Sequence, residues 1–128
     1  MTNEIPASEW KMFFDDLTKR RFDWETKVEV FSEDIGSQVL DTGLSLVGIT
    51  CEGKGDDQFI EIFVGNGEDL HQTHTIKNPS NIAYLGKDDD PGGIVEIEEA
   101  DGTKTLVHIL EPKPLILKFA AAADKAAS

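Results

Sequence analysis

The fold is decided by the stretch Val95-Glu96-Ile97-Glu98-Glu99-Ala100-Asp101-Gly102-Thr103-Lys104-Thr105-Leu106-Val107-His108. Apolar and polar residues alternate on both sides of Asp101-Gly102, and this two-residue period is typical of a strand with one buried face. Asp-Gly between two such runs favours a two-residue type I′ hairpin turn. The stretch therefore predicts an antiparallel hairpin in which Glu99 faces Lys104 with opposite charge.

This hairpin register also decides which side chains share a face. It pairs Ile97 with Leu106 and Val95 with His108, so these four side chains lie on one side of the hairpin. Because three of the four are apolar, that side is expected to be buried. His108 is therefore predicted to point inward.

Strand patterns continue upstream of the hairpin. Trp24, Thr26, Val28 and Val30 alternate with polar residues and are expected on one face. Further strands are expected over residues 44–52, 59–64, 70–77 and 81–85, with Gly48 marking a bulge or bend. The run from 59 to 64 is apolar on both faces apart from Glu61, which is typical of a central strand.

One amphipathic helix precedes these strands. Trp10, Phe13, Phe14 and Leu17 fall at i, i+3, i+4 and i+7, which predicts a helix from about residue 7 to about residue 20. An aromatic stripe of this kind must pack on something. Any part of it that the monomer leaves uncovered would form a dimer interface.

The chain is predicted to be one domain over residues 1–128. It divides into a helix over 7–20, a β-rich body over 24–111, and a tail or short helix over 113–128. A helix followed by about six short strands predicts a mainly β, α+β fold. We expect a strongly bent antiparallel sheet or a small SH3-like or Sm-like barrel, with the helix covering one open end or edge. A two-sheet β-sandwich is the alternative.

Composition narrows the classes of partner. The 128 residues include 25 Asp and Glu against 12 Lys and Arg, a net charge of −13. Such a surface repels nucleic-acid phosphates and anionic membranes, so neither is expected as a partner. With no signal peptide and no membrane-spanning run, a cytoplasmic location is expected. The single cysteine, Cys51, lies in an apolar run and is expected to be a buried, inert thiol.

The segment His71-Gln72-Thr73-His74-Thr75-Ile76-Lys77-Asn78-Pro79 holds two of the three histidines. In a strand, His71, Thr73 and Thr75 point to one side and His74 to the other, with Ile76 marking the inner face. The two histidines are therefore not expected to share a metal ion. The outward row of His71, Thr73 and Thr75 is a candidate binding surface.

The inward residues offer one other arrangement. His74 and His108, joined by an inward carboxylate, are a candidate polar cluster for a small enzyme or a metal site. The chain otherwise has no GxSxG, Walker, CxxC or HExxH motif. We therefore expect a non-catalytic protein-binding or self-assembling module, with a protein partner or a homodimer and no cofactor. The alternatives are the small enzyme or metal site, and an acidic mimic that sequesters a basic partner.

Short motifs in a fixed order also suggest a family. They are Glu4-Ile5-Pro6, Glu9-Trp10, Phe13-Phe14-Asp15, Val28-Glu29-Val30, Ile35-Gly36, Gln38-Val39, Leu46-Val47-Gly48-Ile49, His71, Thr73-His74-Thr75-Ile76, Pro79 and Ala100-Asp101-Gly102-Thr103. Over roughly residues 2 to 110 the chain resembles the small bacterial domain-of-unknown-function family numbered 5335. The resemblance implies a stand-alone cytoplasmic bacterial domain, and it implies no activity and no site residue.

Overall fold

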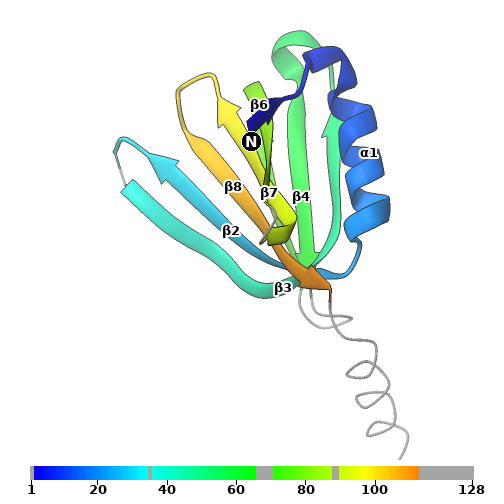
Figure 1. Cartoon of the computed structure of the whole chain (residues 1–128). Helices are drawn as coiled ribbons and strands as arrows, with labels where there is room; N and C mark the ends of the chain where they lie inside the picture. Colours follow the sequence, from blue (N-terminus) through cyan, green and yellow to red (C-terminus); the bar gives the residue numbers. More distant parts are fainter. Residues whose placement is uncertain (1, 35, 66–70, 88–89, 113–128) are drawn as a thin grey trace, which may run out of the picture.

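The computed structural model describes residues 2–34, 36–65, 71–87 and 90–112, and it contains one helix and one sheet (Figure 1). The helix α1 is Trp10–Arg21, preceded by a 3-10 turn, η1, at Ala7–Glu9. The strands are β1 (Thr2–Glu4), β2 (Trp24–Ser32), β3 (Gly36–Glu52), β4 (Phe59–Gly65), β5 (His71–Lys77), β6 (Pro79–Lys87), β7 (Asp90–Glu99) and β8 (Lys104–Pro112), and a second 3-10 turn, η2 (Gly55–Asp57), precedes β4. The tail or short helix predicted over 113–128 lies outside the described residues. In the part of the chain that is described, no helix has the length and apolar composition that crossing a bilayer requires.

The strands form a single eight-stranded sheet in the order β1-β6-β7-β8-β2-β3-β4-β5. All of its neighbouring pairs are antiparallel. The mainly β, α+β prediction with a strongly bent antiparallel sheet is therefore confirmed. Within the described ranges the edge strands β1 and β5 do not pair, so the sheet is not closed into a barrel and is not divided into two sheets. It has eight strands where about six were expected, and β1 at the N-terminus was not predicted. β3 is also longer than predicted, because it begins at Gly36 and not at residue 44.

The sheet bends where single strands pass from one part of it to the other. The first half of β3 pairs with β2, and its second half, from Ser45 onward, pairs with β4. The register shifts between Leu46 and Gly48, which is the bulge that Gly48 predicted. A second corner joins β5 directly to β6 at Asn78, which has φ 52°. Asn tolerates this left-handed conformation better than most residues, so the chain turns here directly from β5 into β6.

Asn78 also ties the corner to two other parts of the sheet. Its N–H donates to the carbonyl of Gln58 at 3.2 Å, and its carbonyl accepts from the N–H of Ala100 at 3.0 Å. The start of β4 and the turn between β7 and β8 therefore meet at this residue. Pro79 begins β6, where its missing N–H is tolerated at the first strand position. The strand expected over 81–85 is therefore longer at its start.

The core lies between the curved sheet and the helix. Trp10, Phe14 and Leu17 of α1 are 4%, 0% and 5% exposed, and Phe13 is half-buried. The predicted stripe is thus buried inside the monomer and leaves little apolar surface for a dimer. The sheet contributes the fully buried side chains Val28, Leu46, Ile49, Ile60, Ile62, Ile76, Ile82, Val95, Ile97, Val107 and Ile109.

The helix is fixed to one backbone edge of the sheet. Thr18 Oγ1 accepts a hydrogen bond from the N–H of Ile49 at 3.1 Å and lies 3.4 Å from the carbonyl oxygen of the same residue. From Leu46 onward β3 pairs with β4 alone among the described strands, so α1 satisfies part of its other edge. On its far side, Phe13 meets Tyr84 of β6 edge-to-face with centroids 6.0 Å apart. As the sequence predicts, the helix covers an open edge.

The register predicted for the β7–β8 hairpin is wrong by one residue. Ile97 pairs with Thr105 and Val95 with Val107. The turn has three loop residues, closed by the N–H of Glu99 donating to the carbonyl of Thr103 at 2.8 Å, and Gly102 takes φ 92°. Asp101-Gly102 therefore belongs to a type of loop in which a left-handed glycine follows a tight turn, and not to a two-residue turn. A one-residue shift exchanges the two faces of a strand.

Candidate functional site

Strand β5 has the face pattern that its sequence predicts. Ile76 is 1% exposed and His74, on the same face, is half-buried opposite Ile62 of β4. Thr73 and Thr75 are exposed on the other face. His71 begins the strand opposite Gly65, and its side chain lies outside the described part of the structure. The described members of the outward row therefore lie together on the outer surface.

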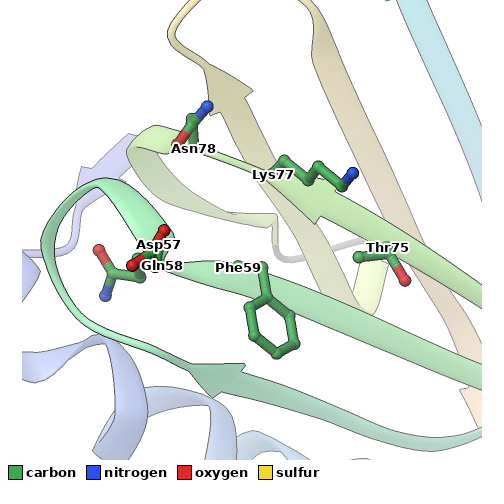
Figure 2. Close-up of a pocket in the computed structure, with 6 residues that line it drawn as sticks. All are labelled: Asp57, Gln58, Phe59, Thr75, Lys77 and Asn78. Atoms are coloured by element: carbon green, nitrogen blue, oxygen red, sulfur yellow. The ribbon is translucent and has the colours of Figure 1, made fainter.

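A pocket of about 440 Å³ opens beside this row. Figure 2 shows the residues that line it: Thr75 and Lys77 on β5, Asn78 at the corner, Phe59 on β4, and Asp57 and Gln58 just before β4. The register of β4 and β5 creates this arrangement, because Phe59 pairs directly with Lys77. The half-buried Phe59 contributes an aromatic ring to the lining of the pocket.

The walls of the pocket combine an aromatic ring with one charge of each sign. Asp57 and Lys77 are exposed, so their charges remain solvated. A hydrogen bond fixes the side chain of Gln58, because its amide nitrogen donates to the sulfur of Cys51 at 3.4 Å. Burial raises the pKa of the Cys51 thiol, and the residue is only 8% exposed. Cys51 is thus the buried thiol that the sequence predicts, and it serves as a support for the pocket wall.

His74 and His108 are not brought together. The corrected register places His108 opposite Ile94 and Lys27, on the face opposite to buried Val107 and Ile109. β8 and β5 are also separated in the sheet by β2, β3 and β4. The predicted inward cluster is therefore wrong, because it depended on a hairpin register that is shifted by one residue. His108 is therefore not a neighbour of His74. Burial of the His74 side chain lowers its pKa.

His108 instead belongs to a charged group on the outer face. Its Nε2 lies 3.1 Å from Glu29 Oε1, and Lys27 Nζ lies 3.2 Å from the same oxygen. The first distance fits an ion pair, but His108 Nε2 does not meet the directional requirements of a hydrogen bond. This group is an imidazole and an ammonium around one carboxylate. Across the described ranges, no three or more His, Cys, Asp or Glu side chains are grouped so that they could hold a metal ion.

Sequence reasoning found one side of the pocket and missed the other. Strand parity identified Thr75, whereas Asp57, Gln58, Phe59, Lys77 and Asn78 were not singled out. A pocket between two strands depends on their pairing register, and alternation within one strand carries no information about that. The available signals were the aromatic Phe59 at the start of a strand and the Asn-Pro corner.

Comparison with known proteins gives a consistent assignment. The chain is 29% identical over 114 residues to an uncharacterized protein of Aquifex aeolicus (strain VF5), covering 89% of this chain and 96% of that protein. No solved structure matches the chain significantly. The model of a family of unknown function, DUF5335, matches residues 1–117, a slightly longer span than the sequence motifs cover. The chain therefore belongs to the DUF5335 family.

Proposed function

We propose that this protein is a non-catalytic module that binds a protein partner on the outer side of β5. The binding surface, called here the β5 surface, consists of the exposed Thr73 and Thr75 together with the pocket residues Asp57, Gln58, Phe59, Lys77 and Asn78. The partner would present an extended segment with one apolar side chain. That side chain would rest on the Phe59 ring, and the segment would run along β5.

One observation carries this proposal, namely an accessible strand edge beside a pocket. β5 is the last strand of the sheet and pairs with β4 over seven residue pairs without a bulge. An edge of this regularity offers backbone donors and acceptors to another extended chain, while a neighbouring pocket selects a side chain. The strand itself has no acidic residue and no proline, so it carries few of the features that block such pairing.

The chemistry of the side chains favours binding over catalysis. Nucleophilic catalysis needs an accessible thiolate or hydroxyl beside a base, and the one thiol is buried with a raised pKa. The two histidines considered for acid–base work lie on opposite faces of the sheet. An aromatic floor with a solvated carboxylate and ammonium at its rim suits recognition of a peptide segment.

The proposal is tested by crosslinking at defined positions. Thr75 is replaced with a photo-crosslinking amino acid in the full chain, expressed in its own host, and Lys19 on the exposed side of α1 is replaced in the same way as a control. We expect a discrete protein adduct from position 75 and none from position 19. The adduct is identified, and the partner is purified and titrated against the wild-type chain.

Binding by the purified partner then decides the outcome. Phe59→Ala and Thr75→Arg should each weaken binding by about tenfold or more, because they remove the pocket floor or block the entrance. Lys19→Ala should leave binding unchanged. Equal adducts at both positions, or an affinity that neither β5 substitution alters, would show that the β5 surface is not the binding site.

A further inference from the structure

A second edge of the sheet carries the largest group of exposed apolar side chains. Among the described strands, β2 alone pairs with residues 36–44 of β3, and β4 joins it from Ser45 onward. Six large apolar side chains are exposed in the described residues, and three of them lie at this edge: Phe31 at 36%, Val39 at 52% and Leu40 at 39%. We call this segment and Phe31 the β3 edge.

The apolar residues of the β3 edge lie close to one another. Phe31 pairs with Ser37, and Val39 pairs with Glu29 two residues further along β2. Phe31 and Val39 are therefore diagonal neighbours on the outer face of the sheet. Leu40 is the extra residue of a bulge, because Val28 pairs with Asp41 and Glu29 pairs with Val39. An apolar group beside an unpaired backbone edge is a typical interaction surface.

The distribution of charge points to one kind of occupant. The molecule carries a net charge of −13, so two copies repel each other over most of their surfaces. Residues 36–44 contain a single charged residue, Asp41, and have neither lysine nor proline to protect the edge. Within residues 36–44 a second copy therefore meets one acidic residue, and the carboxylate of Glu29 beside Val39 is paired with Lys27.

We propose that two copies of this chain associate through their β3 edges, antiparallel and about a two-fold axis near Val39. A two-fold axis pairs a strand with its own copy in the antiparallel direction. With the axis at Val39, the two Val39 side chains meet, each Phe31 lies beside them, and Asp41 faces Ser37 of the other copy. The two Asp41 positions are therefore not directly opposite each other in the register.

The size of the contact sets its strength. A strand segment of this length spans only about 20–30 Å, and the area it buries is small beside the roughly 800 Å² per partner of a standard stable interface. The bulge at Leu40 interrupts the ladder of backbone hydrogen bonds and reduces the contact area further. The dimer is therefore weak and forms in proportion to protein concentration. This inference goes beyond the proposed function and uses a surface separate from β5.

The test is sedimentation velocity of the full chain across a wide concentration range. Val39→Lys should raise the dimer dissociation constant about tenfold or more, since it would bury an unpaired ammonium group. Val47→Lys is the matched control, because Val47 is the same residue type in the same strand, is 40% exposed, and undergoes the same change of charge. It should leave the dimer unchanged.

Hydrogen exchange locates the contact independently of any substitution. At high concentration, amides within residues 36–44 should become protected relative to low concentration, while those of α1 and β5 should not. A strict monomer at all concentrations, equal effects of the two substitutions, or protection confined to another element would overturn the inference. A strict monomer would leave the crosslink at position 75 unaffected, so this failure is distinguishable from failure of the β5 proposal.

Discussion

Two adjacent glycines at the start of β7 occupy a position with no room for a side chain. A Cβ on Gly92 would overlap the carbonyl oxygen of Ile109, and a Cβ on Gly93, which has φ 76°, would overlap the hydroxyl of Tyr84. That hydroxyl donates to the carbonyl of Gly92 at 3.1 Å. The two glycines let β7 approach β8 and the Tyr84 ring closely.

Gly92→Ala should therefore destabilise the protein by about 2 kcal/mol or more, because backbone atoms must shift to admit one methyl group. Gly86→Ala is the control, since its Cβ would make an ordinary contact of 3.5 Å with the Tyr84 ring and its φ is unexceptional. Urea unfolding of both variants measures the difference. Equal stabilities would contradict the close approach at Gly92.

His74 should make stability depend on pH. Burial holds its pKa below the ordinary value of 6.5, so the folded state binds fewer protons than the unfolded state between the folded pKa and 6.5. The stabilisation from neutral His74 is present above about pH 6.5 and is lost as the pH falls through that window. The advantage of wild type over His74→Gln in unfolding free energy should shrink between about pH 7.5 and pH 5. A constant difference would contradict this assignment.

At the scale of elements, one side chain of α1, Thr18, accepts a hydrogen bond from the backbone edge of β3. Thr18→Val keeps the shape of the side chain but leaves the Ile49 N–H without its acceptor, which should cost about 1–3 kcal/mol. Thr73→Val makes the same change on the exposed face of β5 and should stay within about 0.5 kcal/mol of wild type. Thermal unfolding compares the two. If both variants match wild type, the edge contact does not stabilise the helix.

The elements that sequence predicted correctly are those with a strong local period. The stripe from Trp10 to Leu17 and the alternation from Trp24 to Val30 each repeat within one segment, and burial follows that period. The prediction of the β7–β8 register failed because Asp101-Gly102 is compatible with two loop lengths. Packing elsewhere in the molecule decides which of the two loops forms. The candidate site also has one part that a local pattern predicted and one part that it did not. Strand parity located Thr75, whereas the pocket required the β4–β5 register and the corner at Asn78.

The whole molecule carries far more negative than positive charge. At a net charge of −13 the folded state is opposed by self-repulsion, which moderate salt screens over distances of about 10 Å. The ion pairs at Lys27 and Lys104 are partly exposed and are expected to contribute little. The melting temperature should therefore rise when NaCl is increased from low to moderate concentration. A fall would show that ion pairs outweigh repulsion.

The open sheet brings two accessible strand edges to one small domain. α1 covers the second half of β3, while β5 and the first half of β3 each pair with one strand only in the described residues. A closed barrel would have no such edges. This architecture supports the two proposals, in which β5 would recognise a partner segment and the β3 edge would meet a second copy.

The most direct measurement is hydrogen–deuterium exchange of the full chain with and without the partner identified from the position-75 adduct. Strand addition at β5 places new hydrogen bonds on its backbone, so amides within residues 71–77 should become protected, together with those beside Phe59. Amides of α1 and of residues 36–44 should exchange as before at the same protein concentration. Protection that omits β5, with binding intact, would contradict the account.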